Sequence, residues 1–333
     1  MTLQAKLLQQ IRENKFTGTK LSLSGQELTK EDIRLLVDAL NHNITITELD
    51  LSKTNISDQN AIELAKLTNI KVFDISVNNI GPQGIIALSE NNVFTQLNIS
   101  ANPIGASPDA SDAINKLSQN EKLKVLIASE CHLTDDVTKS LFFSKSIKNL
   151  DLSGNHLFGD CLEGFASNNM LTDLDLSQND LSPEVLVFIK DSRVLSYLNL
   201  TNTCISDEGA EYLSQNKSLK ELLLIQCLIG DRGAEFLSQN KTLEKLVLSG
   251  NNISETGKKA LDKSSSLIHI NLRNNPCTKG MTYLSSIINK SKKETLKVES
   301  PRRSSNSSTE DSPGNHSSDD ERLKKNSPRQ LRS

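Results

Sequence analysis

The sequence predicts an α/β solenoid, in which short parallel strands and helices alternate along a ladder of repeated units. Two observations lead to this fold class. The pattern LxxLxLxxN recurs along the chain, for example at 171–179 and 243–251. The second apolar position of the pattern also returns at steps of 28, 24, 24 and 29 residues, followed by six steps of 24. Equal steps of this kind indicate about eleven stacked supersecondary units.

Each unit is expected to contain a strand followed by a helix. The apolar position that marks the register falls at residues 21, 49, 73, 97, 126, 150, 174, 198, 222, 246 and 270. Around it, apolar and polar residues alternate, which predicts a strand with one buried face. Candidate N-caps for the helices are Ser57, Thr134, Ser182, Ser206 and Ser254.

Other residues predict how these helices begin and end. Acidic residues follow the candidate caps, as at Asp135 and Asp207, where the helix dipole favours a negative charge. Asn216 and Asn240 are expected to end helices in the left-handed conformation that Asn tolerates.

These repeats resemble the leucine-rich repeat family over residues 18–299. The resemblance implies a horseshoe of parallel concave strands and convex helices, of the helix-backed class typified by ribonuclease inhibitor. Physical dimensions agree with it, because strands stack at about 4.8 Å while helices need roughly 10 Å. A ladder of such units must bend with its strands inside.

The resemblance also assigns a role to the ninth position of the motif. In this family its Asn bonds backbone groups of adjacent turns, which form a structural ladder. The matching residues are Asn78, Asn102, Asn155, Asn179, Asn251 and Asn275. Gln26, Thr54, Cys131, Thr203 and Cys227 depart from it. We interpret Cys131 and Cys227 as buried structural thiols.

The ends of the chain differ from the repeats. Residues 1–17 place Leu7, Leu8 and Ile11 at helical spacing, which predicts a capping helix for the first repeat. A helix at 281–293 and a half-unit at Leu296 and Val298 could close the array. Residues 300–333 contain ten Ser, three Pro and no aromatic residue, which predicts a disordered tail.

The concave strand positions are the candidate binding residues. Most units have Asp or Asn between the paired leucines, and Asp151 and Asp175 should be close enough to raise each other's pKa. The polar stripe breaks where outward positions become apolar. We predict a partner-binding patch there, made of Tyr197, Leu223, Ile225 and Val247 with Asp151 and Asp175 beside it.

Two groups of polar residues suggest alternative chemistry. The carboxylates at 151 and 175 could form a glycosidase-like pair or a cation site, although a hydrogen-bonded ladder is favoured. His132 and His156, with Cys131 nearby, suggest a metal or thiol-protease site, but turn-lining polar residues are favoured. No Ser/His/Asp order, phosphate loop or HExxH motif is found. We therefore expect no catalytic residue, no metal and no cofactor.

Composition narrows the class of partner. The 333 residues carry 38 basic and 41 acidic side chains, a net charge of −3, which argues against a nucleic-acid or membrane-surface binder. No apolar stretch approaches the roughly 18 residues that read as a membrane span. We expect the protein to be a monomer, to lie in the cytoplasm or, if a bacterium secretes it, in the cytosol of a host cell, and to bind another protein.

The resemblance goes further for the repeats at 205–219 and 229–243. Their pattern, I-x-D-x-G-A-E-x-L-S-Q-N-K-x-L, is similar to leucine-rich repeat effectors of Legionella, which a type IV secretion system delivers into host cells. It implies a non-enzymatic scaffold that binds a host protein. One alternative is a regulator like the Ran-GTPase activators, which use an exposed Arg, for which Arg34, Arg232 and Arg273 are candidates without a matching motif. Another is a cytosolic eukaryotic adaptor.

Overall fold

The computed structural model describes residues 5–278, so the helix expected at 281–293, the half-unit at 296–298 and the tail at 300–333 lie outside the described residues. The described strands form one parallel sheet, in which each strand pairs with the next along the chain. They are β1 Lys20–Ser22, β2 Glu48–Asp50, β3 Val72–Asp74, β4 Gln96–Asn98, β5 Val125–Ile127, β6 Asn149–Asp151, β7 Asp173–Asp175, β8 Tyr197–Asn199, β9 Glu221–Leu223, β10 Lys245–Val247 and β11 His269–Asn271.

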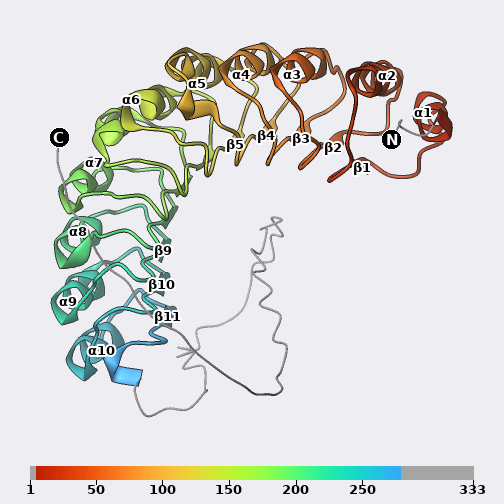
Figure 1. The fold of residues 1–333 in the computed structure, drawn as a ribbon. Helices are drawn as coiled ribbons and strands as arrows, with labels where there is room; N and C mark the ends of the chain where they lie inside the picture. Colours follow the sequence, from red (N-terminus) through yellow and green to blue (C-terminus); the bar gives the residue numbers. More distant parts are fainter. Residues whose placement is uncertain (1–4, 279–333) are drawn as a thin grey trace, which may run out of the picture. The chain divides into compact units, whose positions relative to one another are not determined.

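A helical segment follows each strand and lies on the outer side of the arc, while the strands line its inner side (Figure 1). The α-helices are α1 Ala5–Arg12, α2 Lys30–Asn41, α3 Asp58–Leu64, α4 Pro82–Ser89, α5 Ala110–Gln119, α6 Asp135–Thr138, α7 Val187–Lys190, α8 Ser206–Ser214, α9 Asp231–Gln239 and α10 Glu255–Asp262. The 3₁₀ helices are η1 Ile104–Ala106, η2 Lys139–Phe143, η3 Asp160–Ser167, η4 Pro183–Leu186 and η5 Pro276–Thr278. The predicted α/β horseshoe is therefore confirmed.

The strand register follows the sequence period. Leu174 at the centre of β7 is opposite Leu150 in β6 and Leu198 in β8, and every neighbouring pair of strands is aligned in the same way. All eleven predicted register positions lie at strand centres. A shift of one residue would turn these apolar side chains toward solvent, so burial of one face specifies the register.

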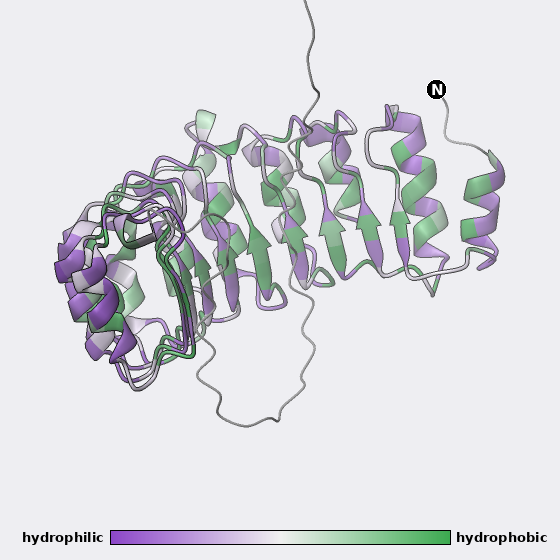
Figure 2. Cartoon of the chain, turned by 90° about the horizontal axis from the view of Figure 1, so that it is seen from below, coloured by the Kyte–Doolittle hydropathy of each residue, from purple (hydrophilic) through white to green (hydrophobic). Residues whose placement is uncertain are grey.

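The core between sheet and helices is aliphatic and continuous. Leu174 and Leu176 have no exposed surface, and the equivalent pairs of the other repeats are buried in the same way except at the last strand, where Ile270 is partly exposed. Each strand has an apolar residue at its centre, and in the strands other than β5 at least one of the two residues beside it is polar (Figure 2). Because one unit cannot bury its leucines alone, each depends on its neighbours for stability. No helix in residues 5–278 has the length and apolarity needed to cross a bilayer.

The ninth-position asparagines connect successive repeats at the C-terminal ends of the strands. The Asn179 amide donates to the carbonyls of Leu152 and Leu176 at 3.0 Å, and its oxygen accepts from the Leu157 N–H at 3.2 Å. Where Asn is replaced, part of this bonding is kept. Thr203 donates through Oγ1 to Leu200 O at 2.6 Å, and the Cys131 thiol lies 3.2 Å from Ile99 O and 3.3 Å from Ser129 O.

A second ladder of asparagines joins the repeats before several of the strands. The left-handed conformation predicted for Asn216 and Asn240 was wrong, although both lie at helix ends as predicted. Asn216 accepts from the N–H groups of Ser218 and Leu219 at 2.8 Å and donates to Ile189 O at 2.9 Å. Asn240 has φ −61°, which is not left-handed. These residues turn the chain into the strand by satisfying backbone groups in two repeats.

Acidic residues at helix starts form a third connection. Asp58 accepts from the N–H groups of Gly81 and Gly84 at 2.7 and 2.9 Å, so it caps the helix of the following repeat. A Cβ on Gly84 would lie 2.7 Å from the same Asp58 oxygen, which explains the glycine there. Asp231 contacts Ser254 and Gly257 in the same way. The acidic positions were predicted, but not the repeat that each one serves.

Four of the five predicted N-caps precede helical segments. Ser57, Thr134, Ser182 and Ser254 occupy that position. Ser206 does not, because α8 begins at Ser206 itself, with φ 55° and Ile205 before it.

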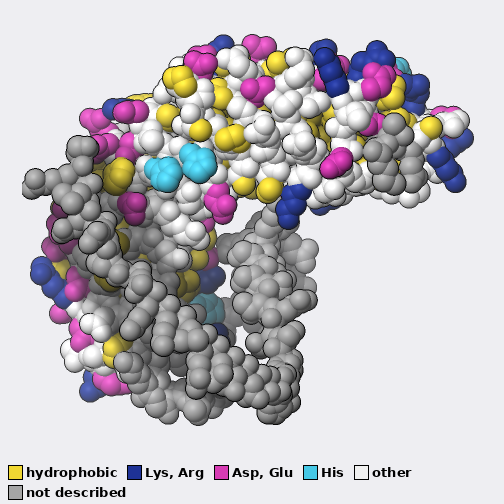
Figure 3. Space-filling model, in the orientation of Figure 1, with side chains coloured by type: hydrophobic (Ala, Val, Ile, Leu, Met, Phe, Trp, Pro, Cys, Tyr) yellow, Lys and Arg dark blue, Asp and Glu magenta, His cyan; other side chains and the backbone are white. Residues whose placement is uncertain are grey.

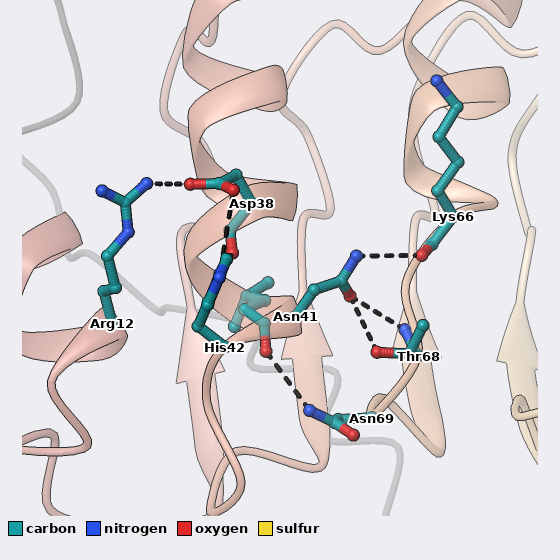
Figure 4. Close-up of polar contacts among 8 residues, drawn as sticks. Arg12, Asp38, Asn41, His42, Lys66, Thr68 and Asn69 are labelled. Carbon is teal, nitrogen blue, oxygen red and sulfur yellow. Dashed lines mark hydrogen bonds and ion pairs between the residues drawn. The ribbon is translucent and has the colours of Figure 1, made fainter.

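The first helix packs on the open end of the array. Ile11 of α1 is fully buried, and its carbonyl accepts from Asn43 Nδ2 at 2.7 Å. The Arg12 guanidinium pairs with the Asp38 carboxylate on α2 (Figure 4). Figure 4 also shows Asn41 bridging to the next repeat through Lys66 O at 3.1 Å. These contacts join α1 to the first repeat and the first repeat to the one that follows.

Candidate protein-binding face

The residue that follows each strand centre points away from the core, and strand pairing places these residues in one row. Across the sheet the row reads Ser22, Asp50, Asp74, Asn98, Ile127, Asp151, Asp175, Asn199, Leu223, Val247 and Asn271. We call it the central row. It crosses the concave face from one end of the array to the other, so its composition decides what that face can bind.

The polar members of the central row are held by local hydrogen bonds. Asp175 Oδ1 accepts from the backbone N–H of Ser177 at 2.9 Å and from its hydroxyl at 2.6 Å. The equivalent bonds occur at Asp50, Asp74, Asn98 and Asp151 with the Ser two residues later. This motif fixes the side chains, since a carboxylate with two donors has one preferred orientation.

Neutral donors from neighbouring strands satisfy some of these carboxylates further. Ser22 donates to Asp50 Oδ2 at 2.9 Å, and Asn98 donates to Asp74 Oδ2 at 3.0 Å. Burial alone would raise the pKa of Asp50, but hydrogen bonds from Ser52 and Ser22 and the charge of Lys20 hold that pKa below its usual range. The first acidic stretch of the row is thus well satisfied.

Asp151 and Asp175 lie directly opposite each other on β6 and β7. Burial raises the pKa of Asp151, and the negative charge of Asp175 raises it further, against the hydrogen bonds from Ser153. Asn199 donates to Asp175 Oδ2 at 2.8 Å. Within residues 5–278 no Lys, Arg or His forms an ion pair with either carboxylate.

The structure brings three of the predicted apolar patch residues together. Leu223 is opposite Val247 in the central row, and Ile225 follows two residues after Leu223 on the same face. Tyr197 is opposite Glu221 instead, in the row on the other side of the strand centres. All four side chains are partly buried. An apolar interruption of a polar row is typical of a contact surface.

Other candidate residues from the sequence lie away from this patch. The rings of His132 and His156 stack with centroids 5.7 Å apart on the surface (Figure 3, cyan). Cys131 is buried, and burial raises the pKa of its thiol to about 12, so it is protonated at neutral pH and a poor nucleophile. In the described part of the chain, no three His, Cys, Asp or Glu residues group as metal ligands would.

The candidate arginines are placed differently from one another. Arg34 pairs with Glu31 at 2.8 Å on α2, and Arg232 on α9 lies over the Phe236 ring and 3.6 Å from Glu211. Arg273 follows β11, and its N–H donates to Asn271 at 3.1 Å. These side chains come from separate repeats.

Comparison with known families agrees with the repeat geometry. A family model described as Leucine Rich repeat matches residues 42–65, 66–89, 167–186, 191–214 and 239–261, and a second, Leucine Rich Repeat, matches 146–168. No curated protein matches the chain.

Solved structures match over most of the chain at low sequence identity. The yeast Rad7 and Elc1 complex is 14% identical, with a TM-score of 0.51, and the match covers 84% of this chain and 85% of that one. An internalin from Listeria monocytogenes is 18% identical with a TM-score of 0.46, over 79% and 94% of the two chains. At this identity the first of these likenesses shows a shared fold only.

Proposed function

We propose, because this chain belongs to the leucine-rich repeat family, that it is a non-enzymatic scaffold that binds a protein on the concave face of its sheet. Proteins of this family typically serve as protein–protein interaction scaffolds. The observation that supports the proposal here is the apolar break in the central row at Leu223 and Val247, next to Ile225. A rigid, hydrogen-bonded surface also loses little conformational entropy on binding.

The finer form of the proposal is that the chain is a bacterial effector and that its partner is a host protein. Its support is the resemblance of residues 205–219 and 229–243 to repeats of Legionella effectors. In this proposal the tail at 300–333 acts as the type IV secretion signal. Fusing residues 300–333 to a reporter enzyme and measuring its delivery into host cells tests this part separately, and a reporter that stays in the bacterium would contradict it.

The GTPase-regulator alternative has less support. It needs an exposed arginine that can reach a nucleotide, whereas Arg34 and Arg232 are engaged by acidic neighbours on their own helical layer. Stimulated GTP hydrolysis that is lost in Arg273→Ala would favour this alternative over the scaffold.

The scaffold proposal is tested by affinity capture with the full chain from a eukaryotic cell lysate, followed by mass spectrometry. We expect Leu223→Asp to weaken binding of the captured protein by roughly 30-fold, the size of an interface hot spot of about 2 kcal/mol. The matched control is Val72→Asp on β3. It adds the same charge at a half-buried position on the concave face, away from the apolar patch. Equal recovery by Leu223→Asp and the wild type, with both folded by circular dichroism, would remove the patch as the binding site.

A further inference from the structure

The central row places two unlike features side by side between β6 and β10. Asp151 and Asp175 form an acidic pair, and Leu223 and Val247 form an apolar pair. Only Asn199 on β8 lies between them in the row. The order along the sheet is therefore two carboxylates, one amide and two aliphatic side chains.

Within residues 5–278 the acidic pair forms no ion pair with a basic side chain. Asp151 Oδ1 accepts from Ser153, but in the described chain its second carboxylate oxygen accepts no hydrogen bond. Its register neighbours are Ile127, which has no donor, and Asp175, which has the same charge. Like charges directly opposite on adjacent strands are destabilising. A positive group placed between the two carboxylates would remove this repulsion.

The other acidic pair of the row differs in this respect. Asp50 and Asp74 are also opposite each other, but Ser22 and Asn98 supply a donor to each from the flanking strands. That pair also has no apolar neighbours in the row. It is therefore a natural control for the pair at 151 and 175, with the same charge and the same backbone.

We propose that the central row from β6 to β10 is a two-part site for a protein segment that carries a basic side chain and an aliphatic side chain. The basic group, for which Arg fits best, binds between Asp151 and Asp175, and the aliphatic group packs on Leu223 and Val247. This inference rests on the proposed scaffold function and names the partner chemistry of the same face. A guanidinium suits the acidic part because its planar fork of donors can serve two carboxylates.

Strand spacing sets the separation of the two groups on the partner. Neighbouring strands are about 4.8 Å apart, so the acidic and apolar parts are separated by roughly 10–14 Å along the row. An extended segment advances about 3.3 Å per residue, and its side chains alternate between two faces. The basic and aliphatic residues should therefore be four positions apart, about 13 Å, so that both face the central row.

The test is selection of short random peptides, displayed on phage, against the immobilised full chain. The expected peptides carry Arg or Lys four positions from Leu, Ile or Val. A synthetic copy of the most enriched peptide should bind the double variant Asp151→Asn, Asp175→Asn at least about tenfold more weakly than the wild type, because a charge-assisted contact is lost. The control double variant Asp50→Asn, Asp74→Asn should bind it as the wild type does.

The outcomes separate this inference from the scaffold proposal. Peptides that lose binding in Leu223→Asp but contain no basic residue, or that bind the Asp151→Asn, Asp175→Asn variant unchanged, would overturn the two-part site and leave the scaffold proposal standing. Selection that yields no peptide dependent on Leu223 would overturn both.

Discussion

The central row has different properties in β2–β4 and in β6–β10, although the strands are equivalent. In β2–β4 the side chains are Asp50, Asp74 and Asn98, and each carboxylate receives donors from the Ser two residues later and from a flanking strand. In β6–β10 one acidic pair is incompletely satisfied and two positions are aliphatic. The strands, their register and their buried apolar centres repeat in both stretches, although the helical layer contains 3₁₀ segments at η2–η4. On the concave face the difference lies in the side chains of the central row.

This contrast separates what the array needs in order to fold from what it can vary. Core leucines and ladder asparagines occur in both stretches, because every repeat must bury its own seam and satisfy its own turns. The concave positions carry no such requirement. A departure from the polar pattern at those positions is therefore better explained by binding than by stability.

The largest effect is expected from the core, and it should be equal in the two stretches. Leu97→Ala in β4 and Leu174→Ala in β7 each remove a buried side chain, which costs about 2–5 kcal/mol. Urea unfolding of both variants measures this. If the two losses of unfolding free energy differed by more than the width of that range of about 2–5 kcal/mol, the two stretches would not be equivalent in packing.

A smaller loss is expected from the ladder. Asn179→Ala leaves the Leu152 and Leu176 carbonyls without their side-chain donor, and each buried group left unsatisfied costs about 1–3 kcal/mol. Asn179→Thr should cost less, because Thr203 shows that a hydroxyl at this position can keep one of the bonds. Unfolding free energies test the order wild type, Thr, Ala, and equal losses for the two variants would contradict it.

The repeat and its register could be predicted because they depend on an apolar alternation that is visible in each unit. Leu174 and its equivalents must be buried in every repeat, so their spacing along the chain determines the repeat length and the strand register. The ninth-position asparagines came from resemblance to a known family. In contrast, Asn216 and Asn240 lie at helix ends as predicted, but a local pattern does not reveal that their amides bond the preceding repeat.

The helical layer was predicted less well for a similar reason. The sequence predicts a helix after each strand, but 3₁₀ segments stand at η2, η3 and η4 in three consecutive repeats. Asp58 lies in the first turn of its own helix, as the acidic pattern predicts, but it also caps the next helix. Its bonds reach residues 23 and 26 positions later in the chain, which a local pattern does not reveal.

The candidate site was predicted at the level of residues and not of geometry. The alternation showed that Leu223 and Val247 point away from the core, and the structure adds that they are opposite each other. It also separates Tyr197 from them by one row. The incomplete satisfaction of Asp151 could not be predicted, because it depends on which neighbours donate and which do not.

The smallest expected effect is the change in stability when a central-row Asp is replaced by Asn. Its sign should differ between the two stretches, so it distinguishes them most directly. The pKa of Asp151 is raised, so the folded chain holds this proton more tightly than the unfolded chain, and stability falls as pH rises through the ordinary and then the raised pKa. Asp151→Asn should therefore stabilise the protein at neutral pH, by about 0.2–1 kcal/mol for a like-charge pair, and the gain should vanish in acid.

The pKa of Asp50 is lowered, so its carboxylate contributes stability above the ordinary pKa that is lost as pH falls through the lowered one. Asp50→Asn should then destabilise the protein at neutral pH, and that loss should also vanish in acid. Thermal unfolding of both variants from neutral to acidic pH tests whether Asp151→Asn raises stability while Asp50→Asn lowers it. Destabilisation by both variants at neutral pH would mean that Asp151 is as well satisfied as Asp50. A gain in stability for Asp151→Asn together with weaker peptide binding by the double variant would instead show that the acidic pair is kept for binding at a cost to the fold.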